Sequence, residues 1–220
     1  MSSMAEAARA TVVSPQKSRA FWLKHLHQWH WVSAAGCLIG LILFSITGFT
    51  LNHAGLIKAQ PEVTTTTAHL PADLLAELRQ VASGAEETPR VLPETIARWL
   101  HQELDVRTDA SKIEWSQDEV YISLPRPGGD AWLTIDLASD AVTHELTDRG
   151  WISYFNDLHK GRNAGPLWSL FIDLFAFAAL IFAVTGLFLL KMHAAHRPAT
   201  WPMVGLGLVL PLLLAMLFIH

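Results

Sequence analysis

Histidine is the residue type in this chain that is best placed to do chemistry. The 220 residues include 11 histidines, and most of them flank long apolar segments. One pattern occurs twice: a histidine, then a Phe-x-x-Thr-Gly run, then another histidine. It comprises His30, residues 44–48 and His53 in the first apolar segment, and His159, residues 182–186 and His193 in the second.

The repeat predicts two layers of histidines. Consecutive membrane helices run in opposite directions, so the second copy of the pattern is inverted relative to the first. One layer holds His30 and His193, with His27 and His196 as alternates about one helical turn away. The other layer holds His53 and His159.

Paired imidazoles indicate haem chemistry. Two histidines from facing helices, without cysteines or a carboxylate cluster, suit the axial ligation of b-type haem, whose iron takes one imidazole on each face. The helix from His30 to His53 spans about 34 Å, which leaves room for one haem in each layer. We therefore predict two haem b groups held through these histidines. Histidines also bind zinc, but paired histidine sites without carboxylates suit zinc poorly.

Ordinary packing is the alternative explanation for several of these features. Gly36, Gly40, Gly48 and Gly186 could leave space for a flat macrocycle, but small residues four apart also let plain membrane helices approach. Asp173 is an ionisable residue within an apolar segment, where charge is costly. For Asp173 we favour a hydrogen bond to a neighbouring helix over a role in handling protons or a cofactor.

Three apolar segments must position the histidines. The chain is 51% hydrophobic and 16% charged, and Asp173 is the one charged residue in the apolar runs of these segments. At about 1.5 Å per residue, each run can cross roughly 30 Å of hydrocarbon. We predict transmembrane helices at residues 29–53, 166–191 and 201–220, the last of which contains Pro202 and Pro211.

Basic residues on the shorter flanks predict the orientation. Four precede the first span and two separate the second from the third: Arg9, Lys17, Arg19, Lys24, Lys191 and Arg197. We expect residues 1–28 and the loop 192–200 to be cytoplasmic, and residues 54–165 to be periplasmic, in a bacterial inner membrane.

Residues 54–165 have the pattern of a small α+β domain. A Thr-rich linker at 64–67 precedes two helices with leucine spacing, at 71–81 and 93–104. Alternating apolar residues then predict four short strands, at 112–115, 119–124, 131–137 and 141–146. An amphipathic stretch, 151–159, leads along the membrane surface to the second span.

Hydrolytic and disulfide chemistry are not supported. Cys37 is the only cysteine and lies within the first span, so neither an intramolecular disulfide nor a thiolate metal site is available. The sequence contains no Ser-His-Asp order, phosphate loop or HExxH motif. We assign no catalytic residue.

The ends of the first two spans resemble the PepSY-associated transmembrane proteins, in particular their short three-helix branch. The matching motifs are Thr47-Gly48, Thr50-Leu51-Asn52-His53-Ala54, Asp157-Leu158-His159-Lys160-Gly161-Arg162 and Thr185-Gly186. The strand pair 132–136 and 142–146 is similar to the end of a PepSY module, although Asp140 stands where a turn glycine is usual.

The resemblance implies an inner-membrane protein with a periplasmic PepSY-like domain. Some larger relatives are haem-containing reductases of ferric siderophores, and they have an additional helix and a larger external portion. A three-helix chain is therefore expected to pass electrons as a subunit, or to need a membrane or cytoplasmic reductase as partner. Its acceptor would be a periplasmic ferric chelate such as a ferric siderophore.

Two functions follow as hypotheses. The leading one is an electron-transfer protein with b-type haem, acting as a ferric siderophore reductase or as a subunit of one. The alternative is a membrane-anchored PepSY binding or regulatory module of the peptidase-inhibitor kind, without redox activity. Residues 54–165 contain 18 acidic and 10 basic residues, which suits a basic partner. We expect lipid contact and no nucleic-acid partner.

Overall fold

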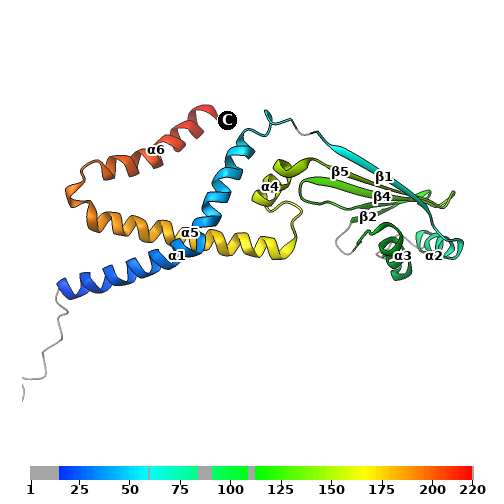
Figure 1. The fold of residues 1–220 in the computed structure, drawn as a ribbon, viewed down its shortest axis with the longest axis horizontal. Coiled ribbons are helices and arrows are strands. Elements are labelled where there is room, and N and C mark those ends of the chain that lie inside the picture. The colour runs from blue at the N-terminus through cyan, green and yellow to red at the C-terminus, as the bar shows by residue number, and fades with distance from the viewer. Residues whose placement is uncertain (1–14, 59, 84–90, 109–111, 220) are drawn as a thin grey trace, which may run out of the picture. The chain divides into compact units, whose positions relative to one another are not determined.

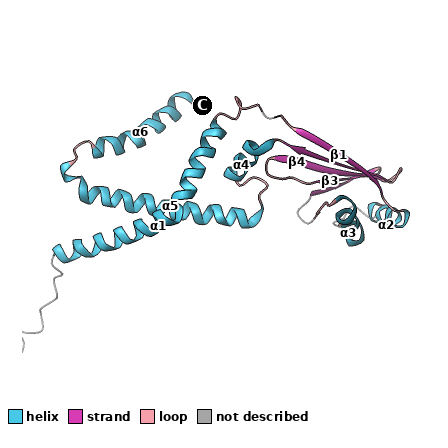
Figure 2. Ribbon diagram, viewed as in Figure 1, coloured by secondary structure: helices cyan, strands magenta, loops and turns pink. Residues whose placement is uncertain are grey.

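The computed structural model describes residues 15–58, 60–83, 91–108 and 112–219 (Figure 1). By backbone contacts the chain forms two compact units. One unit is Met1–Ile42 with Asp173–His220, and the other is Leu43–Ile172. Figure 2 shows that helices make up the first unit, whereas the second combines helices with a sheet.

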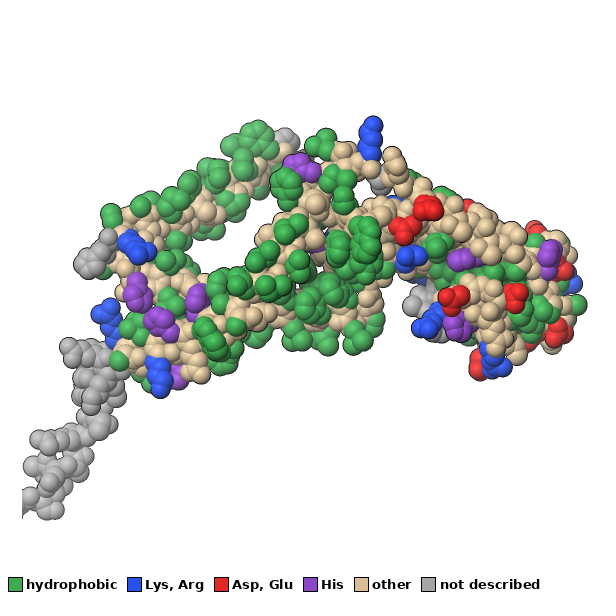
Figure 3. All heavy atoms as spheres, viewed as in Figure 1, with side chains coloured by type: hydrophobic (Ala, Val, Ile, Leu, Met, Phe, Trp, Pro, Cys, Tyr) green, Lys and Arg blue, Asp and Glu red, His purple; other side chains and the backbone are tan. Residues whose placement is uncertain are grey.

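Three helices are long and apolar enough to cross a membrane. They are α1 (Pro15–Asn52), α5 (Gly165–His193) and α6 (Thr200–Phe218), and a 3-10 turn, Ala194–His196, follows α5. Hydrophobic side chains cover all three helices (Figure 3). The prediction of three spanning helices is confirmed.

The first helix begins earlier than the predicted span. It starts at Pro15 rather than near residue 29. Proline suits the first helical position, and neither proline nor glycine interrupts the sequence from residue 16 to residue 35. The charged and aromatic residues before the apolar run therefore continue the same helix.

A five-stranded antiparallel sheet forms the centre of the second unit, in the order β1-β5-β4-β3-β2. The strands are β1 (Glu62–His69), β2 (Lys112–Trp115), β3 (Glu119–Ser123), β4 (Gly129–Asp136) and β5 (Ala141–Asp148). The four strands from β2 to β5 match the predicted strands to within two residues at each end. The small α+β domain is confirmed.

The core lies between the sheet and two helices, α2 (Ala72–Ala82) and α3 (Glu94–Leu104). Leucine and isoleucine at helical spacing point from these helices toward alternate residues of β3, β4 and β5. The fully buried members of this core include Leu78, Ile96, Leu100, Val120, Ile122, Leu133, Ile135 and Val142.

The Thr-rich segment 64–67 was expected to be a linker, and this prediction is wrong. It lies in β1, which pairs with β5 from Glu62 opposite Asp148 to His69 opposite Ala141. Threonine is β-branched and favours extended backbone. Most side chains of this edge strand are exposed, so the sequence lacks the apolar alternation that marks a half-buried strand.

Helix α4 (Gly150–Lys160) follows the sheet and corresponds to the predicted amphipathic stretch. The buried carboxylate of Asp157 accepts a hydrogen bond of 2.9 Å from the backbone N–H of Gly128, which fastens α4 to the loop before β4. Gly161 ends the helix with φ +66, a conformation that glycine adopts without a side-chain clash. The chain reverses here and enters α5.

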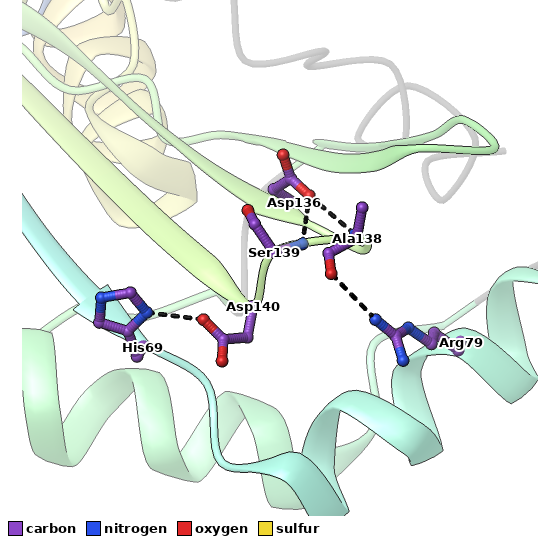
Figure 4. A network of polar contacts seen from close by, with 6 residues as sticks. All are labelled: His69, Arg79, Asp136, Ala138, Ser139 and Asp140. Carbon is purple, nitrogen blue, oxygen red and sulfur yellow. Dashed lines mark hydrogen bonds and ion pairs between the residues drawn. The ribbon is translucent and has the colours of Figure 1, made fainter.

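Polar contacts also fix the tight turn between β4 and β5 (Figure 4). Asp136 accepts hydrogen bonds from the backbone N–H groups of Ser139 and Ala138, which lower the pKa of its carboxyl. Asp140 adopts φ +59, so an aspartate occupies the left-handed position where glycine is usual. Its carboxylate lies 2.6 Å from Nδ1 of His69 at the end of β1.

Candidate functional site

His30 is inserted between side chains of α5. Its Nδ1 lies 3.1 Å from the Oγ1 of Thr185 and 3.1 Å from the carbonyl oxygen of Phe182. The imidazole stacks on the Phe182 ring, with centroids 4.6 Å apart and planes at 17°. A Cβ added to Gly186 would lie 3.2 Å from Cε1 of His30. The Phe182, Thr185 and Gly186 positions thus form a seat for this ring.

His159 occupies an equivalent seat formed by α1. Its Nδ1 lies 2.7 Å from the Oγ1 of Thr47, and its ring centroid lies 4.9 Å from that of Phe44. A Cβ on Gly48 would lie 3.6 Å from Cε1 of His159. The inverted sequence repeat therefore has a structural counterpart. In each copy, Phe-x-x-Thr-Gly on one helix receives a histidine from another helix, as its helical spacing allows.

Hydrogen bonding fixes which ring nitrogen of His30 carries the proton. The carbonyl oxygen of Phe182 can only accept, so Nδ1–H of His30 donates to it, while the neighbouring Thr185 hydroxyl donates to the carbonyl of Ile181 at 2.6 Å. In neutral His30, Nε2 therefore keeps its lone pair, the electron pair that binds a metal. The contact of 2.7 Å between His159 Nδ1 and the Thr47 hydroxyl suits either tautomer, because a hydroxyl both donates and accepts.

His193 meets His27 rather than His30. The ring centroids of His27 and His193 lie 5.8 Å apart with planes at 82°. Each Nδ1–H donates to the carbonyl four residues earlier on its own helix, at 2.8 Å to Leu23 and 2.8 Å to Leu189. Both rings are exposed, and in the described part of the chain neither Nε2 has a hydrogen-bond partner. Of the two candidates on α1, the alternate is the one that pairs.

The predicted pair of His53 and His159 is not in ring contact among the described residues. His53 donates from Nδ1 to the carbonyl of Phe49 at 3.0 Å and packs on the Phe49 ring. Asn156, three residues before His159, takes the position that His27 has relative to His30. Its Oδ1 accepts a hydrogen bond of 2.8 Å from Thr50. The two copies of the repeat therefore differ at the residue three positions before the seated histidine, which is His27 in one copy and Asn156 in the other.

Several other candidates have simpler surroundings. Gly40 faces the ring of Phe175 and thus serves helix packing, whereas a Cβ on Gly36 would meet nothing within 4 Å. Asp173 is exposed, and the expected hydrogen bond to a neighbouring helix is absent among the described residues. His196 lies in the 3-10 turn after α5, and its side chain is outside the described part.

The pairing of His27 with His193 was not predicted as the principal one. The spacing already indicated this pairing, since His27 lies about one turn before His30 on the same face of α1. The decisive fact is tertiary: His30 is already bound by Thr185 and Phe182.

Membrane-spanning helices, an inverted histidine repeat and a small α+β domain define a class of membrane-anchored protein, and a family match agrees with it. The chain matches the family described as Putative PepSY_TM-like over residues 21–220 and belongs to that family. This confirms the resemblance to PepSY-associated membrane proteins. Neither a curated protein nor a solved structure matches the chain.

Proposed function

We propose that this PepSY-associated membrane protein binds haem b and passes electrons across the inner membrane to a periplasmic acceptor, such as a ferric siderophore. The observation that carries the proposal is the pair of exposed imidazoles, His27 and His193, contributed by two different spanning helices. Haem iron would supply reversible one-electron transfer at this place.

The His27 and His193 side chains would hold the haem, whose iron would supply the redox chemistry. Their ring centroids lie 5.8 Å apart on two different spanning helices, so the two imidazoles are close enough to share one metal ion. The hydrogen bonds from Nδ1–H to Leu23 and Leu189 select the tautomer that offers Nε2, as the outer partners of metal-bound histidines usually do.

His53 and His159 are proposed for a second haem on their donor chemistry alone. His53 donates from Nδ1 to the carbonyl of Phe49 at 3.0 Å and so offers Nε2, and His159 offers Nε2 in the tautomer that donates from Nδ1 to Thr47, 2.7 Å away. In this arrangement Thr47 and Thr185 act as positioning residues, because each holds an imidazole against a neighbouring helix. His30 then orients the helix pair rather than completing the His27 and His193 site.

Haem content measured by the pyridine haemochrome method tests the proposal. Purified protein, expressed with adequate haem supply, should contain about two haems per chain, each held by two imidazoles. His193→Ala or His27→Ala should remove about one of them. His101→Ala, in α3, is the matched control and should retain both. No haem above trace in the unsubstituted protein would contradict the proposal.

A binding module without redox activity is the second candidate, because one face of the sheet is open. Opposite the face covered by α2 and α3, Tyr121 and Trp132 stack with centroids 6.3 Å apart. Trp132 Nε1 donates to Glu145 at 3.2 Å. Acidic side chains are numerous on this domain (Figure 3), and it carries 18 acidic against 10 basic residues. Specific capture of a basic peptide by haem-free protein would favour this function.

A further inference from the structure

An apolar groove runs between the N-terminal part of α1 and the middle of α5. Its volume is about 590 Å³, within the usual range for a small-molecule site. Its walls include four aromatic rings, one imidazole and one hydroxyl, contributed by Phe21, Trp22, Trp29, Phe177, His25 and Thr185. All lie within the two segments that are long and apolar enough to cross a membrane.

The position of the groove selects lipid-soluble ligands. Residues 21–28 precede the predicted span and lie at its expected cytoplasmic edge, whereas Phe177, Ile181 and Thr185 lie inside the second span, so a lipid-soluble ligand can reach the groove from the bilayer. Flat aromatic walls favour a planar ligand, since ring faces stack in offset or edge-to-face arrangements. Phospholipid acyl chains would also pack against these walls, but they have no ring to stack on the aromatic side chains and no polar group for His25.

His25 adds to the groove a side chain that can form a hydrogen bond with a ligand. Its ring is half-buried and packs against Phe21 with centroids 4.3 Å apart, and it has no hydrogen bond among the described residues. The Thr185 hydroxyl is already occupied, because it accepts from His30 and donates to Ile181. An imidazole without a partner beside apolar walls favours a ligand that carries a carbonyl or hydroxyl group.

We propose that this groove binds the head group of a membrane quinone, with one quinone oxygen hydrogen-bonded to His25. A quinone combines a flat ring, polar oxygens at the ring edge and solubility in the bilayer. Electron donation would come from the reduced form, the quinol, which becomes the quinone as it releases two electrons and two protons; that use rests on the haem proposal above, whereas the binding site itself does not.

Equilibrium binding of a radiolabelled short-chain quinone to the full-length protein in phospholipid nanodiscs tests the site. Ile181 lines the groove, so Ile181→Trp should fill it and abolish saturable binding. Leu180 is the adjacent residue, is 59% exposed and does not line the groove. Leu180→Trp introduces the same bulk and should bind like the unsubstituted protein. His25→Leu should weaken binding roughly tenfold, the effect of losing about one hydrogen bond.

A second measurement protects the test against misfolded variants. A photoreactive quinone should label peptides that contain residues 21–29 or 177–185 in the unsubstituted protein. Labelling confined to other segments, or equal binding by the Ile181→Trp and Leu180→Trp variants, would overturn the proposal. Full displacement of the quinone by added phospholipid would assign the groove to acyl chains instead.

The haem content of the same samples separates the two proposals. Quinone binding is measured on haem-free and haem-loaded protein alike. If the protein takes up no haem but still binds quinone, the haem proposal is contradicted and the quinone site stands; if it takes up haem but does not bind quinone, the reverse holds.

Discussion

At the scale of single residues, the histidine seats show how a short polar motif works inside an apolar helix pair. In each seat the threonine hydroxyl lies within hydrogen-bond distance both of a carbonyl of its own helix and of the incoming imidazole. Hydrogen bonds between membrane helices are worth about 0.6 kcal/mol on average. The two His–Thr contacts are therefore modest in energy but specific in geometry.

The two histidine seats should respond differently when their glycine is replaced by alanine. Gly186→Ala places Cβ 3.2 Å from His30 Cε1, which forces that ring to move, whereas Gly48→Ala meets His159 at an ordinary 3.6 Å. Alanine also favours a helix over glycine by about 1 kcal/mol. We expect Gly48→Ala to preserve or raise the thermal unfolding midpoint in detergent, and Gly186→Ala to lower it relative to Gly48→Ala. Equal unfolding midpoints of the two variants would contradict this prediction and show that both seats accommodate a methyl group equally well.

Replacing either His53 or His159 should remove the same haem. If His53 and His159 hold the same iron, His53→Ala or His159→Ala should each reduce haem from about two per chain towards one, and the double variant should lose no more. The other haem should survive, since distant sites without shared partners respond independently. Additive loss in the double variant would assign the two histidines to different haems.

At the scale of elements, the β4–β5 turn is held by groups from three directions. Asp136 caps two backbone N–H groups, His69 contacts Asp140, and the Arg79 guanidinium of α2 donates to the carbonyls of Leu137 and Ala138. Figure 4 shows these contacts, apart from the one with Leu137, converging on one short segment. The turn therefore connects the edge strand, the hairpin and a covering helix.

Protonation of Asp136 should loosen this turn. Hydrogen bonds from the N–H groups of Ser139 and Ala138 hold the pKa of the Asp136 carboxyl below its ordinary value of 3.8. The folded state thus favours the carboxylate, and this contribution is present above pH 3.8 and is lost as pH falls through the lowered pKa. Asp136→Asn should reduce the loss of stability between pH 5 and 2, followed by near-UV circular dichroism. Asp118→Asn removes a carboxylate that has no hydrogen-bond partner among the described residues, and as the control it should leave the acid transition unchanged.

At the scale of the whole molecule, the proposed function requires a defined orientation. From the shorter basic flanks, the positive-inside rule predicts a cytoplasmic N-terminus, a cytoplasmic connection between α5 and α6 and a periplasmic sheet domain. Alkaline phosphatase fused after Asp130 should be active, and the same fusion after His196 should be inactive. Activity with the reverse pattern would put the acidic domain in the cytoplasm and would contradict delivery of electrons to a periplasmic acceptor.

The sequence by itself determined the three apolar spans, the α+β domain between the first two and the family. These features depend on local composition and periodicity, which a single chain displays directly. The same local reasoning failed for residues 64–67, because the pairing of β1 with β5 is a contact between segments far apart in the sequence. It also identified the inverted histidine repeat correctly without showing which side chains meet.

Tertiary structure alone decided the histidine partners. Helical spacing places His27 and His30 on one face of α1, and only the approach of α5 decides that Thr185 receives His30 and that His193 meets His27. The same holds for the quinone groove, whose walls come from residues about 150 positions apart in the chain. A sequence pattern specifies which side chains share a helix face, whereas the packing of two faces depends on the shape of both.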